Sequence, residues 1–291
     1  SDGSRISYGA LLLATGAEPV RLTVPGASLP HVRVLRTLSD CDALIARIGT
    51  AHRCVVVGAG FIGLEVAASL RARGLEVRVV APDALPMERI LGATMGDMVK
   101  VLHESHGVIF HLGATVTKIE PDRVGLSTGA EVAADLVIAG IGVRPEVALA
   151  EEAGLAVDRG VTVDAFLQTS VPGVYAAGDI ARWPDPRTGD HIRVEHWVVA
   201  ERQGAVAARN ILGQRQRFAA VPFFWTQQYD TVINYVGHAE QWDRIDIDGD
   251  PGAHDCMVIY WRNAKQLAVA TVGRDLDSLR AELAFEKETP A

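Results

Sequence analysis

The stretch CVVVGAGFIGLEVAAS, residues 54–69, decides the fold. A short apolar strand pattern runs into a G-x-G-x-x-G motif, a helical pattern follows, and a second strand is predicted over residues 76–81. In such a motif Gly58 permits the tight turn, Gly60 lets a pyrophosphate approach the backbone, and Gly63 lets the helix pack against the strand. The stretch therefore predicts a dinucleotide site at a helix N-terminus, where free N–H groups attract phosphate. A glycine-rich structural turn without a ligand is the alternative.

The residues after the second strand leave the choice between NAD and NADP open. In many dinucleotide sites an acidic residue about 20 positions beyond the motif binds the adenosine ribose and repels a 2′-phosphate. Here the strand ends at Ala81, and Asp83 follows two residues later. Asp83 is a candidate for the ribose, and Arg78 and Arg89 are candidates for a phosphate. Each of these charges can equally be an ordinary surface residue.

Hydrophobic periodicity and glycine or proline breaks predict the remaining elements. Helices are predicted over residues 38–48, 61–73, 94–106, 201–212 and 276–286, the first with Ser39 or Asp40 as N-cap. Strands are predicted over residues 6–16, 53–57, 108–111, 115–120, 123–128, 135–139, 160–163, 173–177, 232–236, 244–247, 257–262 and 266–272. The pattern up to about residue 156 is typical of an α/β nucleotide-binding domain, and the later aromatic-rich alternation predicts an antiparallel sheet.

The composition favours a soluble globular protein. The chain has 291 residues, 48% of them hydrophobic, and no apolar run approaches the roughly 20 residues that span a bilayer. The formal net charge of -8 argues against a broad nucleic-acid surface. Three cysteines without a close pair fit a reducing compartment, so we expect a cytoplasmic protein without membrane or nucleic-acid partners. The nine histidines show no zinc-like spacing, and no metal site is predicted.

Five motifs follow one another along the chain. They are LATG at residues 13–16, GAGFIG at 58–63 followed by Glu65, GIG at 140–142 followed by Arg144-Pro145, TSVPGVYAAGD at 169–179, and EHW at 195–197. Their combination resembles the pyridine-nucleotide flavoprotein oxidoreductases. The segment FWTQQYD at residues 224–230 resembles the ferredoxin reductase branch, which includes putidaredoxin reductase, dioxygenase reductases and apoptosis-inducing-factor-like proteins. The resemblance covers essentially the whole chain.

The resemblance implies an α/β fold in which a Rossmann-like NAD(P)-binding domain is inserted in a partial FAD-binding domain and followed by a C-terminal α+β domain. The implied limits are residues 1–38 and 158–217 for the two FAD-binding segments, 39–157 for the NAD(P)H-binding domain and 218–291 for the interface domain. The family has another glycine motif in a first βαβ unit, whereas this sequence contains one. We therefore expect the chain to lack that N-terminal portion, to hold FAD poorly and to be inactive as it stands.

The resemblance also implies roles for individual residues. The implied FAD-binding residues are Thr15, Gly16, Arg36, Gly178, Asp179 and Trp197. The implied NAD(P)H-binding residues are Gly58, Gly60, Phe61, Ile62, Gly63, Arg89, Ile141, Gly142 and Glu195. The implied catalytic residues are Glu65, beside the nicotinamide, and Trp225, next to the reacting rings. The alternatives are that Asp179 is a helix N-cap and that the tryptophans are core residues.

The implied function is that of a reductase. Hydride would pass from NAD(P)H to FAD, and electrons would then reach a ferredoxin or Rieske-type iron–sulfur protein, so no protein nucleophile is required. A disulfide reductase or NADH oxidase is a rival, but the His-Pro pair usual in disulfide reductases is absent, because His238 precedes Ala239 and His254 precedes Asp255. A nucleotide-binding or signalling module of the apoptosis-inducing-factor type, without turnover, is the non-enzyme alternative. A homodimer remains open.

The acidic net charge does not exclude a local basic patch. Arg202, Arg209, Arg215 and Arg217 would lie near one another if residues 201–212 are helical. Because ferredoxins are commonly acidic, this patch is the candidate docking surface. A solvated helix face is the alternative interpretation of the same charges.

Overall fold

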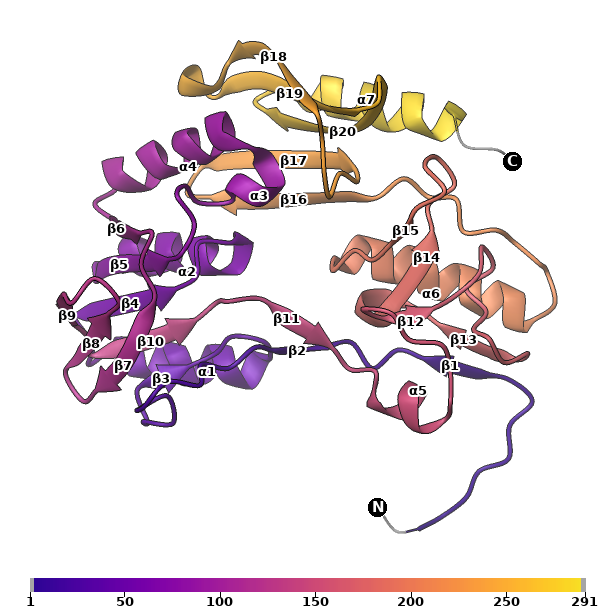
Figure 1. Ribbon diagram of the computed structural model, residues 1–291, viewed down its shortest axis with the longest axis horizontal. Coiled ribbons are helices and arrows are strands. Elements are labelled where there is room, and N and C mark those ends of the chain that lie inside the picture. Colours follow the sequence, from indigo (N-terminus) through magenta and orange to yellow (C-terminus); the bar gives the residue numbers. More distant parts are fainter. Residues whose placement is uncertain (1–2, 289–291) are drawn as a thin grey trace.

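The computed structural model describes residues 3–288, which form three packed parts (Figure 1). One part is a parallel sheet with its helices, and another holds several short strands around one long helix. An antiparallel sheet with the C-terminal helix lies across both of them. This arrangement confirms the expected fold class, a Rossmann-like α/β core followed by a C-terminal antiparallel-sheet domain.

The parallel sheet has the strand order β3-β10-β4-β5-β6. Its strands are β3 (Val32–Arg33), β10 (Leu136–Ala139), β4 (Arg53–Val57), β5 (Glu76–Ala81) and β6 (Ile109–Leu112). Most residues of β4, β5 and β10 are buried, which explains their apolar, β-branched sequences. Successive residues of a strand point to opposite faces, so Val56 and Val55 of β4 belong to two different hydrophobic cores.

Helices pack on one face of the parallel sheet and a small antiparallel sheet packs on the other. The helices are α1 (Leu38–Ile48), α2 (Phe61–Ala72), α3 (Glu88–Leu91) and α4 (Ala93–Ser105). The small sheet consists of β7 (Val116–Glu120), β8 (Arg123–Leu126) and β9 (Glu131–Ala133). Arg53 and Asp135 form an ion pair of 2.6 Å where β4 and β10 begin, and this contact lowers the pKa of Asp135 to about 2.

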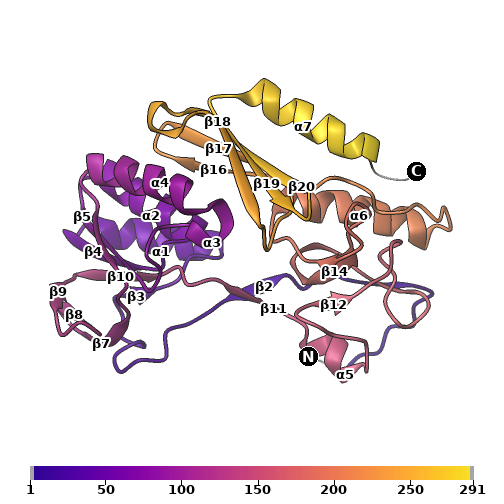
Figure 2. The ribbon, with the colours of Figure 1, turned by 45° about the horizontal axis from the view of Figure 1, so that its top comes forward.

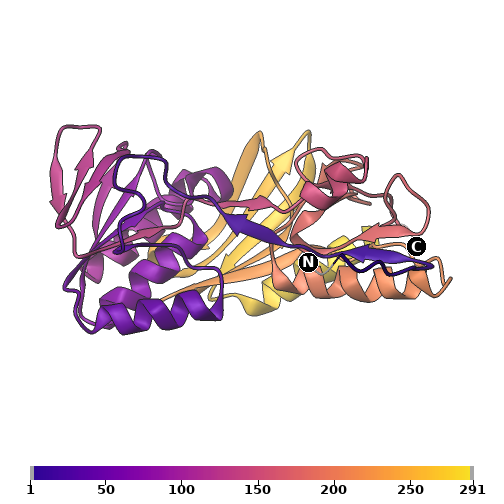
Figure 3. The same cartoon turned by 90° about the horizontal axis from the view of Figure 1, so that it is seen from below.

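The part around the long helix has a separate hydrophobic core that includes Trp183 and Val199. Its elements are β1 (Leu11–Leu13), α5 (Ala148–Glu152), β12 (Val161–Thr162), β13 (Val174–Ala176), the 3-10 helix η1 (Gly178–Ile180), β14 (Ala181–Pro184), β15 (His191–Ile192) and α6 (Trp197–Ile211). Two antiparallel strands, β2 (Ala17–Pro19) and β11 (Val143–Pro145), connect this part to the parallel sheet (Figures 2 and 3). The chain therefore crosses between the two parts twice, at adjacent positions.

The antiparallel sheet has the strand order β16-β17-β20-β19-β18. Its strands are β16 (Phe223–Gln228), β17 (Thr231–Gly237), β18 (Arg244–Asp250), β19 (Asp255–Arg262) and β20 (Lys265–Val272); the 3-10 helix η2 (Pro251–Ala253) and α7 (Asp275–Glu288) complete this part. Tyr235 and Tyr260 share a buried cluster with Leu64 of α2, and the hydroxyl of Tyr260 donates a hydrogen bond of 2.9 Å to the carbonyl of Leu91. The sheet is therefore packed firmly on the helices of the parallel-sheet part.

The structure confirms the predicted bounds of β4, β5 and α1, but it corrects the predictions for residues 6–16 and for the N-cap of α1. Residues 6–16 are not one strand: Leu11–Leu13 have ladder partners in β13, whereas Ile6 is 85% exposed. The N-cap of α1 is Thr37 rather than Ser39 or Asp40. Thr37 is extended and accepts a hydrogen bond from the N–H of Asp40, whose carboxylate accepts one in return.

Helix α6 begins four residues earlier than predicted. His196 is its N-cap, and its ring nitrogen accepts a hydrogen bond from the N–H of Val198. The residues Trp-Val-Val that open the helix have modest intrinsic helix propensity. Val199 is 2% exposed, so tertiary packing outweighs that propensity. The early start brings Trp197 into the first turn of the helix.

Candidate active site

The glycine turn between β4 and α2 has the geometry expected of a dinucleotide site. Gly58 has a φ of +108°, and a Cβ there would lie 2.2 Å from the carbonyl oxygen of Gly140. A Cβ on Gly63 would lie 2.2 Å from the carbonyl oxygen of Gly58, so this glycine lets α2 approach the turn. A Cβ on Gly60 would meet no atom within 4 Å, which leaves open space at the helix N-terminus. Since no side chain caps α2, the first-turn N–H groups are free for phosphate oxygens.

Apolar side chains stand exposed beside these glycines. Ile62, in the first turn of α2, is 52% exposed, and Ile141, between Gly140 and Gly142, is 38% exposed. Phe61 instead packs edge-to-face on Phe224 of β16, with ring centroids 5.2 Å apart. The predicted NAD(P)H residues around the two loops therefore form an open apolar surface next to free N–H groups.

An ion pair lies just beyond the end of β5, near the position where many dinucleotide sites have an acidic residue that binds the ribose. Ala81 is buried, and the carboxylate of Asp83 lies 2.7 Å from the guanidinium of Arg89. The Arg89 side chain is otherwise 80% exposed. Arg78 is engaged within its own strand by Glu76, at 2.6 Å. The pair of Asp83 and Arg89 therefore carries both the charge that would repel a 2′-phosphate and the charge that would attract one.

Several predicted FAD-binding residues come together from distant segments. Arg36, just before α1, lies 3.1 Å from the carboxylate of Asp179 in η1 and 3.2 Å from the position of a Cβ on Gly16. The hydroxyl of Thr15 donates a hydrogen bond of 2.5 Å to the carbonyl of Glu146, just beyond β11. The carboxylate of Asp179 does not cap η1, whose N-cap is Ala177. The N-cap interpretation of Asp179 is therefore wrong.

A hydrogen bond to the long helix α6 fixes Gly178. Its N–H donates a hydrogen bond of 2.8 Å to the side-chain carbonyl of Gln203 on α6. Gln203 is fully buried, and its Nε2 has no partner in the part of the chain that the structure describes. The Gly178-Asp179 turn is thus fixed to α6 while the Asp179 carboxylate faces Arg36.

Aromatic side chains meet where α6 and β16 approach each other. Trp197 and Trp225 pack edge-to-face with ring centroids 5.7 Å apart, and the His196 ring lies 5.3 Å from that of Trp225. Trp197 is 60% exposed and Trp225 is 37% exposed, so the interpretation of these tryptophans as core residues is wrong. Burial lowers the pKa of His196, and the nearby Asp179 carboxylate opposes this effect. The junction presents aromatic surface that the chain itself leaves uncovered.

Glu65 of α2 contacts the opposite face of β16 from Trp225. The hydroxyl of Thr226, the residue after Trp225, donates a hydrogen bond of 2.5 Å to the Glu65 carboxylate. Burial raises the pKa of Glu65, while the hydrogen bonds from the Thr226 side chain and the Gln227 backbone oppose the rise. Strand β16 therefore contacts the tryptophan of α6 through Trp225 on one face and the carboxylate of Glu65 through Thr226 on the other.

Glu195 lies at the edge of this junction. Its carboxylate pairs with Arg193 at 2.6 Å, and it directly precedes the N-cap of α6. The sequence analysis missed Thr226, Gln228 and His103, which are buried polar residues. Thr226 and Gln228 stand two residues apart and so share one face of a strand, and this spacing was the available signal.

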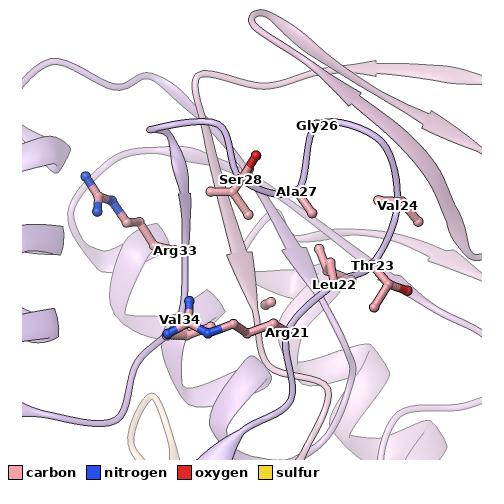
Figure 4. A pocket seen from close by; sticks show the side chains of 11 residues that line it. Arg21, Leu22, Thr23, Val24, Gly26, Ala27, Ser28, Arg33 and Val34 are labelled. Carbon is pink, nitrogen blue, oxygen red and sulfur yellow. The ribbon is translucent and has the colours of Figure 1, made fainter.

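Two cavities lie next to the parallel sheet, and one of them reaches two of the predicted residues. A cavity of about 310 Å³ lies beside Ala139 at the end of β10, where Arg21 and Arg33 approach it from the loop after β2 and from β3 (Figure 4). No predicted site residue lines it. A second cavity, of about 250 Å³ between α1 and α2, is lined in part by Ile62 and Glu65. The candidate site is therefore a surface junction rather than a closed pocket.

Residues 3–288 contain neither a metal-binding group nor a membrane-spanning helix. No group of three His, Cys, Asp or Glu side chains in this range could hold a metal ion. Within the same residues, none of the helices is both long enough and apolar enough to cross a membrane.

The residues present fit FAD and NAD(P)H. The open space at Gly60 and the free first turn of α2 suit a pyrophosphate. Asp179 offers a carboxylate to hydroxyl groups, and the exposed faces of Trp197 and Trp225 suit planar rings. The fold and this site define a class, an oxidoreductase with one glycine-motif dinucleotide site and a second, aromatic-lined cofactor surface under a C-terminal sheet.

Family models narrow this class. The model described as pyridine nucleotide-disulphide oxidoreductase matches residues 1–204, and the model described as reductase C-terminal matches residues 223–291. The chain belongs to the pyridine nucleotide-disulphide oxidoreductase family, whose cofactors are FAD and NAD(P)H.

Individual relatives confirm the resemblance to the ferredoxin reductase branch. Rhodocoxin reductase of Rhodococcus erythropolis is 34% identical over 294 residues, which cover 99% of this chain and 69% of the relative. The anthranilate 1,2-dioxygenase system ferredoxin–NAD(+) reductase component of Burkholderia cepacia is 36% identical, covering 97% and 71%. The crystal structure of the covalent putidaredoxin reductase–putidaredoxin complex is similar with a TM-score of 0.95 at 33% identity, covering 99% and 72%.

Replacing Gly60 by alanine is expected to weaken nucleotide binding and leave the fold intact. The φ of Gly60 is -89°, which alanine adopts, and the added Cβ meets no atom of the chain, so Tm should change by no more than about 2 °C. The Cβ would occupy the space for the pyrophosphate, so the Kd for NADH should rise about tenfold in a fluorescence titration. Gly58→Ala is the matched control, because its positive φ and its contact with Gly140 should lower Tm by at least about 4 °C. Unchanged NADH affinity in Gly60→Ala contradicts the assignment.

Removing the carboxylate of Asp83 is expected to shift nucleotide preference toward NADPH. Asp83→Ala frees the Arg89 guanidinium, which can then pair with a 2′-phosphate, and it also removes a repelling charge. The ratio of the Kd values for NADH and NADPH should rise about tenfold at low salt, equivalent to about 1.4 kcal/mol. Glu104→Ala, which removes the same charge from the Lys100–Glu104 pair on α4, should leave the ratio unchanged. An equal shift in both variants would exclude a specific role for the Asp83–Arg89 pair.

Proposed function

We propose that this protein is an NAD(P)H-dependent, FAD-containing reductase that passes electrons to a ferredoxin-type iron–sulfur protein. The observation that carries the proposal is that β16 contacts both predicted cofactor surfaces: Trp225 packs on Trp197 of α6, and Thr226, on the opposite face of the strand, bonds Glu65 of α2. The relatives that match nearly the whole chain are named as reductases, one of a ferredoxin, and the solved complex contains putidaredoxin. A reductase accounts for both predicted cofactor surfaces and for the strand that contacts the two of them.

The chain contributes binding and orientation to this reaction. The first turn of α2 binds phosphate, and the Asp179–Arg36 pair holds a hydroxylated, phosphorylated ligand on the opposite side. When bound, the nicotinamide and the flavin supply hydride transfer and single-electron release. Trp197 and Trp225 would pack against planar rings and exclude water from them, while Glu65 offers a hydrogen-bond acceptor on the other face of β16.

Several finer features belong to the same proposal. The acceptor is a small ferredoxin or a Rieske-type protein, and the protein acts in the cytoplasm, either alone or as a homodimer. The described cysteines Cys41, Cys54 and Cys256 are all free, which supports a reducing compartment. The proposed domain limits are residues 1–38, 39–157, 158–217 and 218–291. Their support is that the β2–β11 crossing separates two distinct hydrophobic cores.

Electron transfer through an added ferredoxin tests the proposed function. The full-length protein, supplied with FAD, NADH and a [2Fe–2S] ferredoxin, should reduce cytochrome c, and omission of the ferredoxin should abolish most of the rate. Nucleotide binding without turnover to cytochrome c or to ferricyanide would instead support a binding or signalling module. Faster turnover with oxygen or with an aromatic disulfide than with ferredoxin would support an NADH oxidase or a disulfide reductase.

The arginines near the end of α6 are expected to steer the acceptor. Arg202 pairs with Glu282 of α7, which leaves Arg209, Arg215 and Arg217 exposed and outside any ion pair in the described chain. Helix geometry places Arg209 about 18 Å along α6 from Trp197, so we expect long-range attraction rather than direct contact.

Reversing Arg209, Arg215 and Arg217 to glutamate should raise the KM for ferredoxin several-fold at low ionic strength. The effect should vanish above about 0.3 M salt, because screening shortens the range of the attraction. Arg202→Glu, which disturbs an existing ion pair on the same helix, is the control for general damage to α6. An unchanged KM in the triple variant at low salt contradicts the steering role.

A further inference from the structure

A buried line of polar side chains runs inward from Glu65. The hydroxyl of Thr226 bonds the Glu65 carboxylate at 2.5 Å, the side-chain amide of Gln228 bonds the Thr226 hydroxyl at 2.9 Å, and His103 Nε2 lies 3.1 Å from Gln228 Oε1. Thr226 is 1% exposed, and Gln228 and His103 are fully buried. Three consecutive hydrogen bonds therefore connect Glu65 of α2 to His103 of α4.

When Glu65 is ionised, every hydrogen bond in this line must have its donor on the side away from Glu65. An ionised carboxylate can only accept, so the single hydroxyl proton of Thr226 points to Glu65. The Thr226 oxygen must then accept from the Gln228 amide, and the Gln228 carbonyl accepts from an Nε2–H of His103. Every donor in the line points toward Glu65, and such aligned hydrogen bonds reinforce one another. A protonated Glu65 could itself donate, and the direction would no longer be fixed.

The surroundings of His103 agree with this direction. Burial lowers the pKa of His103 to about 4, so the ring is neutral near pH 7 and carries one proton. Its Nδ1 is buried and has no partner among the described residues, which identifies it as the unprotonated nitrogen. The groups packed around the ring are His106 of the same helix, Phe110 and Tyr229. Tyr229 in turn stacks on His106 at 3.6 Å between ring centroids.

The titratable neighbours of Glu65 are few. Burial is the main cause of its raised pKa, and hydrogen bonds from Thr226 and from the Gln227 backbone are the opposing causes. Cys41 of α1 and Arg73 of α2 line the same cavity as Glu65. From β16, the strand packed against α2, the contacting groups are the uncharged Thr226 side chain and Gln227 backbone. The charge on Glu65 is thus stabilised chiefly by hydrogen bonds.

We propose that Thr226, Gln228 and His103 are positioning residues whose directed hydrogen bonds hold the Glu65 carboxylate in one orientation and favour its ionised form. Thr226 and Gln228 belong to the C-terminal sheet, whereas Glu65 and His103 belong to helices of the parallel-sheet part. The line of hydrogen bonds is complete when these two parts are packed together. Correct packing of the sheet therefore sets the orientation and the ionisation of the Glu65 carboxylate. The link from Glu65 to nicotinamide chemistry rests on the proposed function; the line of hydrogen bonds does not.

Thr226→Val tests the proposal because valine keeps the shape and removes the hydroxyl. The titration of Glu65 is followed by the infrared band of its protonated carboxyl group, isolated by subtracting the spectrum of Glu65→Gln. Loss of a hydrogen bond to a charged group should move the midpoint upward by about one pH unit. Thr226→Ser, which keeps the hydroxyl, should restore the original midpoint. Equal midpoints in Thr226→Val and Thr226→Ser overturn the proposal.

A matched control lies in another strand of the same sheet. Thr271 is fully buried on β20, and its hydroxyl has no partner in the described chain. Thr271→Val removes a comparable buried hydroxyl outside the line and should leave the Glu65 midpoint unchanged. A shift equal to that of Thr226→Val overturns the proposal, because the effect would then reflect general loosening of the sheet.

The tautomer of His103 gives a second readout that does not depend on a shifted midpoint. Nitrogen-15 NMR of histidine-labelled protein, with His103→Phe to assign the signals, should show the proton on Nε2 at a pH where Glu65 is ionised. A proton on Nδ1 under those conditions overturns the directed line. Neither the infrared titration of Glu65 nor the nitrogen-15 spectrum of His103 uses turnover. Both can therefore be interpreted even if the protein fails to reduce ferredoxin. If the protein is a reductase but Thr226→Val does not shift the Glu65 midpoint, only the positioning role is refuted.

Discussion

The structure depends on one hydrophobic core shared by the parallel-sheet part and the C-terminal sheet. Val56 of β4, Leu64 of α2, Tyr235 of β17 and Tyr260 of β19 belong to a single buried cluster. Burying a large apolar side chain contributes about 1.5–3 kcal/mol, so separating these two parts would expose many such contributions at once. Because this core fixes the sheet on α2, it also fixes where β16 can place its side chains.

That placement explains how a polar site forms within an apolar contact. β16 carries Trp225 toward α6 and Thr226 toward Glu65, on opposite faces of one strand. Buried polar groups are tolerated when their hydrogen bonds are satisfied, and the line from Glu65 to His103 largely meets that condition. The same strand thus supplies aromatic surface to one cofactor-type site and polar contacts to the other.

The glycine motif was predictable because its physics is local. The turn at Gly58, the open approach at Gly60 and the packing at Gly63 follow from backbone geometry over a few residues, and the structure shows each feature. The contact between Thr226 and Glu65 spans 161 residues, and that between Arg36 and Asp179 spans 143. No pattern within a short window contains such information, so family resemblance suggested three of these residues and Thr226 was missed.

The sequence by itself determined the βαβ unit, the bounds of α1, β4 and β5, and the roles open to the glycines. These features depend on periodicity, backbone freedom and turn chemistry, which neighbouring residues decide. The tertiary structure decided where residues 6–16 stop pairing, where α6 begins, and which side chains Glu65 meets. Those outcomes depend on ladder partners and burial supplied by distant segments, and a chain acquires them only when its parts pack together.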